Sequence, residues 1–136
     1  MNAHNQAVKA VSERLPQFYS WRAAFRVYHG STNSTRAVYK KSDKIVDTSQ
    51  LDHVLAVDKA KKTALVEPNV SMDKLVQATL EKGLVPVVVM EFPGITVGRG
   101  FSGAAGERSS GRRGPFDLTI DSIEIVVPNE DVFHAS

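Results

Sequence analysis

The sequence has no cysteine, no long apolar run and no large excess of charge of one sign. The missing cysteine excludes disulfides, thiolate metal sites and cysteine nucleophiles. The longest apolar stretch, residues 84–90, contains Pro86 and falls far short of the roughly 20 residues that cross a bilayer. The first 30 residues carry Glu13 and Arg14 and no continuous apolar core, which argues against a signal peptide. We therefore expect a cytoplasmic protein, or one peripheral to a membrane.

The overall charge is nearly balanced, because 17 basic residues face 15 acidic residues and leave a net charge of +2. With 42% hydrophobic residues, the chain has the composition of an ordinary globular protein. A disordered polyampholyte and a wholly basic nucleic-acid arm are therefore excluded, and no nucleic-acid partner is expected. The length of 136 residues fits one domain or one half of a larger one.

Glycine is scarce except in one segment, residues 94–114, which holds seven of the nine glycines. The same segment contains four arginines and one acidic residue, so it is locally basic. Regular structure throughout is excluded, because glycine weakens the interiors of helices and strands. The segment is either a flexible tail or a loop shaped around a ligand.

The apolar pattern predicts an α+β fold. We expect a helix over residues 5–24, broken or kinked at Pro16, and a helix over 71–82 that begins at Ser71 and stops at Gly83. Residues 51–57 fit either a strand or a helix, and residues 84–90 fit a buried strand. Further strands are predicted at residues 23–28, 44–48, 63–67 and 122–127, with 131–135 as the hairpin partner of the last.

Two loops have compositions suited to holding phosphate. The first follows a predicted strand and combines a glycine, four hydroxyls and a carboxamide, whose donors can converge on an anion. Its residues are Gly30, Ser31, Thr32, Asn33, Ser34 and Thr35. A surface turn has the same composition, so this alternative stays open. A P-loop is excluded, because the loop lacks the Gly-Lys-Ser/Thr ending.

The second loop spans residues 93–110, and its glycines let the backbone approach a bulky diphosphate while nearby arginines add positive charge. Gly98, Gly100 and Gly103 match G-x-G-x-x-G, but the strand-ending acid of a dinucleotide-binding unit is missing from its usual context. A Gly/Arg segment that binds RNA is the alternative. Ile95, Val97 and Phe101 punctuate the glycines as packed residues would, which favours a shaped loop.

Three segments together resemble one family in order and spacing. They are residues 29–36 (HGSTNSTR), 66–72 (VEPNVSM) and 89–98 (VMEFPGITVG). The resemblance is to FAD-linked oxidoreductases with a vanillyl-alcohol-oxidase-type (PCMH-type) flavin domain, and within them to the Δ24-sterol reductase branch. It implies a two-subdomain FAD-binding fold, incomplete at its C-terminal end: an N-terminal helical segment (1–22), a first subdomain (23–93) and the start of a second (94–136).

The resemblance also implies which residues bind the cofactor. Residues 30–35 would hold the FAD pyrophosphate, and the second loop would line its other side through Thr96, Val97, Gly98, Gly100, Gly103, Glu107 and Ser109. Some relatives tether FAD through a histidine that follows the glycine. Here His29 precedes Gly30, so we expect non-covalent FAD. The whole enzyme would reduce a C=C bond with NADPH through FAD.

The chain departs from the family pattern at Arg99, Ala104, Arg108 and Arg113. Arg99 replaces a glycine, and a side chain there adds roughly 1 kcal/mol of strain if its φ is positive. The substrate domain is missing from this sequence, so no catalytic residue is assigned, and a missing C-terminal half or an oligomer partner would have to supply it. A truncated remnant without stable FAD binding is the alternative.

The remaining polar residues show no metal spacing, and no metal site is expected. We interpret His53 and His134 as structural or surface residues, and the aspartates between residues 43 and 58 as a solvated face. Glu107 would pair with a neighbouring arginine or contact the cofactor.

Overall fold

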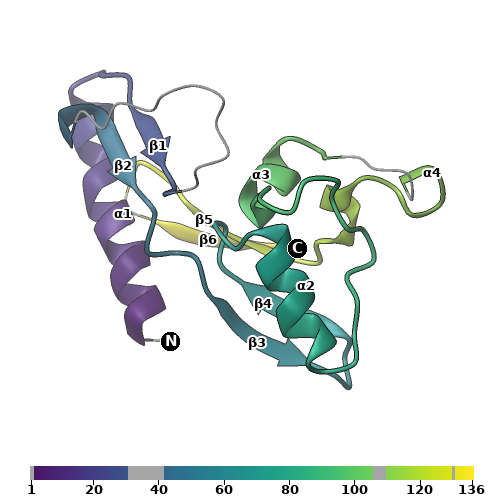
Figure 1. Cartoon of the computed structure of the whole chain (residues 1–136). Helices are drawn as coiled ribbons and strands as arrows, with labels where there is room; N and C mark the ends of the chain where they lie inside the picture. Colours follow the sequence, from purple (N-terminus) through teal and green to yellow (C-terminus); the bar gives the residue numbers. More distant parts are fainter. Residues whose placement is uncertain (1, 31–41, 106–109, 130) are drawn as a thin grey trace. The chain divides into compact units, whose positions relative to one another are not determined.

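The computed structural model describes residues 2–30, 42–105, 110–129 and 131–136. Within these ranges the chain forms two compact units, each with its own apolar core. The N-terminal unit comprises Met1–Leu51 and Ser122–Ser136, and the central unit comprises Asp52–Asp121. Helices and strands occur in both units (Figure 1), which confirms the α+β prediction. The division into cofactor subdomains at residues 23–93 and 94–136 stays a prediction.

The N-terminal unit is built on α1 (Asn2–Ser20), which packs beside β2 (Ile45–Asp47). Its buried face pairs Val11, Leu15 and Phe18 with Val46 and Leu51. The expected break at Pro16 is wrong, since the helix continues through that residue. The contacts made on both sides of Pro16, by Val11 and Phe18, help to hold the helix together despite the missing amide donor.

Two pairs of strands complete this unit. β1 (Arg26–Tyr28) pairs in parallel with β2, and the short 3-10 helix η1 (Ser42–Lys44) leads directly into β2. β5 (Ile123–Val126) and β6 (Val132–Ala135) form the predicted antiparallel hairpin. The carboxyl ends of β1 and β2 therefore lie side by side, and the residue that follows β1 at this edge is His29, ahead of Gly30.

The central unit begins with the antiparallel pair β3 (Val54–Asp58) and β4 (Thr63–Val66), which settles residues 51–57 as strand rather than helix. The helix α2 (Met72–Leu80) packs against β3. Ser71 is its N-cap residue, and Gly83, at φ +71°, follows its end as predicted. The core of this unit joins Val70, Met72 and Leu75 to Val88, Met90, Val97 and Phe116.

The prediction of a buried strand at residues 84–90 is wrong, because none of these residues lies in a strand. The segment does alternate as a strand would, with Val88 and Met90 buried and Val85, Val87 and Val89 exposed. No strand of the described ranges pairs with it, and Pro86 has no amide to donate to one. The residues form an extended segment, from which Val88 and Met90 pack into the core of the central unit.

The glycine-rich segment contains two short helices, α3 (Val97–Ser102) and α4 (Ser110–Arg113), and the 3-10 helix η2 (Phe116–Thr119) follows. Its mixture of short helices and loops fits the expectation that it is not regular throughout. None of the helices described here is both long enough and apolar enough to cross a membrane.

Candidate functional site

The predicted site residues fall in both units. Gly30 lies in the N-terminal unit, whereas Thr96, Val97, Gly98, Gly100 and Gly103 come together in and around α3 in the central unit. Ser31, Thr32, Asn33, Ser34, Thr35, Glu107 and Ser109 lie outside the described residues, as does Arg108. The cofactor assignment of all these residues stays a prediction.

Gly30 has a left-handed backbone, with φ at +72°. This conformation is easy for glycine and costs other residues roughly 1–2 kcal/mol. A Cβ at this position would lie 3.2 Å from the Cβ of Ser49, which follows β2. Gly30 is therefore required by its conformation and by the close approach of a neighbouring strand end.

The neighbouring strand end contributes hydroxyl groups that sequence reasoning did not single out. Thr48 donates its amide at 2.8 Å and its hydroxyl at 3.1 Å to the carbonyl oxygen of Tyr28. Ser49 donates its amide and its hydroxyl to Oδ1 of Asp47, at 2.9 and 2.6 Å. The signal in the sequence was the Asp-Thr-Ser run after an apolar pair. These bonds fix the edge beside which Gly30 turns.

At the start of α3, Thr96 is the N-cap residue and its hydroxyl oxygen accepts the amide of Arg99 at 3.4 Å. The amide of Val97 donates to Val70 O at 2.8 Å, and that of Gly98 donates to Pro68 O at 2.7 Å. The amide of Gly100 donates to Thr96 O, also at 2.8 Å. The first turn of this helix therefore has its amides engaged by the protein.

The glycines of α3 are required by packing. A Cβ on Gly98 would lie 2.9 Å from the Cβ of Pro68, and a Cβ on Gly100 would lie 2.5 Å from Met90 Sδ. At Gly103 the nearest atom would be Arg99 O, at 2.9 Å. Gly100 thus lets α3 lie against the core residue Met90, Gly98 lets it lie against the turn at Pro68, and Gly103 leaves room for a carbonyl of the helix itself.

The departures from the family pattern have separate outcomes. Arg99 lies inside α3, is exposed and is not a positive-φ residue, so the conditional strain at this position does not arise. Ala104 does have a positive φ, of +45°. Arg113 is exposed in α4. Of these three positions, Ala104 is the one with an unfavourable backbone conformation.

A cluster that sequence reasoning missed lies where β3 begins and β4 ends. Oε2 of Glu67 accepts the His53 amide at 2.7 Å and lies 2.9 Å from His53 Nδ1. Asp52 lies 3.2 Å from the same Nδ1 and binds the ammonium group of Lys74 at 3.1 Å. His53 thus lies between two carboxylates, and its assignment as a structural or surface residue stays a prediction.

The ligand atoms of Asp52, His53 and Glu67 lie within 4.8 Å of one another, a spacing that a metal ion could bridge. Lys74 already neutralises Asp52, and Oε2 of Glu67 is already engaged by the amide and the ring of His53. We therefore interpret the cluster as an ion-pair and hydrogen-bond network.

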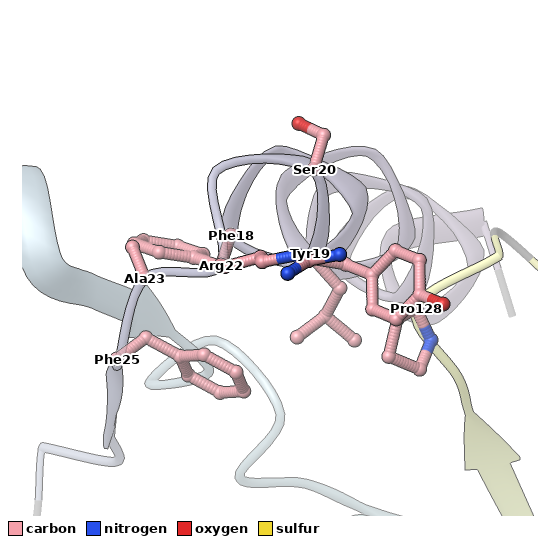
Figure 2. A pocket seen from close by; sticks show the side chains of 8 residues that line it. Phe18, Tyr19, Ser20, Arg22, Ala23, Phe25 and Pro128 are labelled. Carbon is pink, nitrogen blue, oxygen red and sulfur yellow. The ribbon is translucent and has the colours of Figure 1, made fainter.

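An open pocket of about 490 Å³ lies in the N-terminal unit, beside the end of α1 (Figure 2). Phe18, Tyr19 and Phe25 form its aromatic walls, and Arg22 extends between them. Arg22, which follows the end of α1, has a positive φ of +48°. Pro128 closes one side. Of the predicted site residues that the structure describes, none lines this pocket.

The chain matches the family model described as "FAD binding domain" over residues 5–136. It is 35% identical over 91 residues to the Delta(24)-sterol reductase of Arabidopsis thaliana, a match that covers 67% of this chain and 16% of that protein. The protein of the same name from Pisum sativum is 33% identical over the same shares. The Caenorhabditis elegans protein "Delta(24)-sterol reductase homolog dhcr-24" is 27% identical, over 96% of this chain and 26% of that protein. The chain thus spans between about a sixth and a quarter of these relatives.

Proposed function

Because this chain belongs to the family of FAD-binding domains, we propose that it holds FAD non-covalently and that its loop at residues 30–35 binds the pyrophosphate. The observation that carries this proposal is the conformation of Gly30. A left-handed glycine at the carboxyl end of a parallel strand pair can form one half of the αR–αL turn whose successive amides bind anions. The hydroxyl-rich sequence that follows adds neutral donors.

The second segment, residues 96–110, supports the proposal in a different way. The amides of Val97 and Gly98 already donate to protein carbonyls, so free amides at the start of α3 are not what this segment would offer a phosphate. It would offer the positive charge of Arg99, which is exposed. We therefore assign hydrogen bonding to the phosphate to the first loop, residues 30–35.

For the whole protein we propose an oxidoreductase related to the sterol reductases that the chain resembles. Their names concern the Δ24 position of a sterol, and the chain covers 16–26% of their length. Bound FAD would relay reducing equivalents from NADPH to a C=C bond. The substrate pocket would come from a further part of the protein or from an oligomer partner.

An absorbance spectrum of the purified chain, after addition of FAD and desalting, tests the proposal. Flavin bands that survive desalting are the expected result. A spectrum without flavin bands, from protein that circular dichroism shows to be folded, would contradict stable FAD binding and favour the truncated remnant. RNA binding that weakens steeply with salt would favour the Gly/Arg alternative instead.

A further inference from the structure

Glu67 is a buried carboxylate at the end of β4, with a side chain that is 2% exposed. Burial of a charged group is unfavourable unless hydrogen bonds compensate it. The compensation comes from His53, whose amide and ring both contact Oε2, at 2.7 and 2.9 Å. His53 itself is exposed, so the buried member of this pair is the carboxylate.

The carboxylate takes the place of a backbone acceptor in the strand ladder. A hydrogen-bonded pair in an antiparallel sheet normally exchanges two backbone hydrogen bonds. Here the Glu67 amide donates to His53 O at 3.0 Å, but the His53 amide donates to the Glu67 side chain. The carbonyl of Glu67 instead accepts the amide of Val70 at 3.2 Å, which closes a turn over residues 67–70.

This turn holds the start of α3. Its Pro68 and Val70 carbonyls accept the amides of Gly98 and Val97, the first two residues of the helix, at 2.7 and 2.8 Å. Amides in the first turn of a helix have no partner within the helix. The turn supplies those partners and so fixes where the helix begins.

We propose that Glu67 is a positioning residue for α3. Its side chain accepts the His53 amide, which leaves the Glu67 carbonyl to close the turn and the turn's carbonyls to anchor Val97 and Gly98. The role requires an acceptor at the reach of a glutamate side chain and does not require its charge. The inference rests on the proposed function only in taking α3 as a segment that faces FAD.

Hydrogen exchange on the full chain, followed amide by amide, tests this role. Glu67→Asp keeps the charge and shortens the reach, so we expect exchange at Val97 and Gly98 to become about tenfold faster relative to Leu75 in α2. Glu67→Gln loses the charge and keeps an acceptor at full reach, so exchange at both amides should stay within about twofold of wild type.

Asp58→Ala is the matched control. Asp58 accepts the amides of Ala60 and Lys61, at 2.9 and 3.0 Å, in the turn at the other end of the same hairpin. Its loss weakens the hairpin without touching the turn at residues 67–70, so Val97 and Gly98 should keep their protection relative to Leu75.

Two results would overturn the inference. Loss of protection in Glu67→Gln with retention in Glu67→Asp would assign Glu67 a role that depends on charge, as an ion-pair partner or metal ligand. An equal loss in Asp58→Ala and Glu67→Asp would show general loosening of the hairpin. FAD titration of the wild-type chain is a separate experiment. If the chain does not bind FAD, the proposed function is wrong, whereas the role of Glu67 is decided by the exchange rates alone.

Discussion

The amide of Gly98 donates to the carbonyl of Pro68 at 2.7 Å, and the space that a side chain on Gly98 would need is filled by the ring of the same proline. A helix therefore lies against a turn with its backbone in direct contact. Gly98 thus has a structural reason in this chain that is independent of any ligand.

Substitution of the helix glycines should lower stability in a set order. Gly98→Ala should cost about 2–3 kcal/mol, because Pro68 and its backbone are rigid. Gly100→Ala should cost less, about 1–2 kcal/mol, because the nearest atoms belong to the flexible end of Met90, although Phe116 Cδ1 would also lie 3.0 Å away. Urea unfolding of the purified variants measures both values.

Gly111→Ala is the control for this series, since a Cβ there would meet no atom within 4 Å. Its free energy of unfolding should stay within about 0.5 kcal/mol of wild type or rise slightly, because alanine favours helix. Equal costs at Gly98 and Gly111 would show that the contact with Pro68 does not constrain α3.

Gly30→Ala should weaken FAD binding, because alanine disfavours a φ of +72° and would crowd Ser49. We expect a loss of about fivefold or more in affinity, measured by quenching of flavin fluorescence. Gly83→Ala is matched in φ, at +71°, but lies after α2 with open space around it. It should lose a similar stability and no FAD affinity; equal losses of affinity would argue against a cofactor role for Gly30.

Lys62→Gly should stabilise the chain by about 0.5–1 kcal/mol, because Lys62 has a φ of +56° in the turn between β3 and β4. The neighbouring Lys61 is not a positive-φ residue, so Lys61→Gly should be destabilising through added freedom of the unfolded chain. Thermal unfolding of the two variants should therefore shift in opposite directions. Parallel shifts would show that the backbone of this turn is not strained.

Asp73 should contribute to stability in a pH-dependent way. The hydroxyl of Ser71 and then the amide of Lys74 hold its pKa below the usual 3.8. A carboxyl whose pKa is lower in the folded state stabilises the protein above the unfolded pKa and loses that effect as pH falls through the folded pKa. Asp73→Asn should therefore be less stable than wild type near neutral pH, and the difference should shrink as pH falls through the lowered pKa of Asp73. A stability difference that persists unchanged at low pH would contradict this assignment.

The parts of the fold that depend on local signals could be predicted from the sequence. The stop of α2 at Gly83 is set by a residue next to the helix, and the hairpin of β5 and β6 by a short turn. Ser71 stands at the N-cap position as predicted, but its side chain makes no capping bond, and the amides of Met72 and Asp73 donate to the distant carbonyls of Ile95 and Pro93. The strand expected at residues 84–90 failed because a strand needs a partner. The alternation of exposed and buried residues at Val87, Val88 and Val89 is a local property of the sequence. Pairing depends on a second strand from elsewhere in the chain.

The candidate site was only partly predictable, for the same reason. The glycines of the second segment stand out in the sequence, but the atoms that require them, in Pro68 and Met90, come from distant positions. In the sequence, Glu67 is a single acidic residue that precedes a proline. Its role depends on His53, 14 residues earlier, and no periodicity of the sequence indicates that contact.

Arg99 is exposed on α3. Its neighbours Gly98 and Gly100 are packed so closely that an added Cβ would meet Pro68 or Met90. The charge of this helix can therefore be changed by substitution at position 99 while its packed face stays as it is. An engineer could use that position to tune attraction for anionic ligands without redesigning the scaffold.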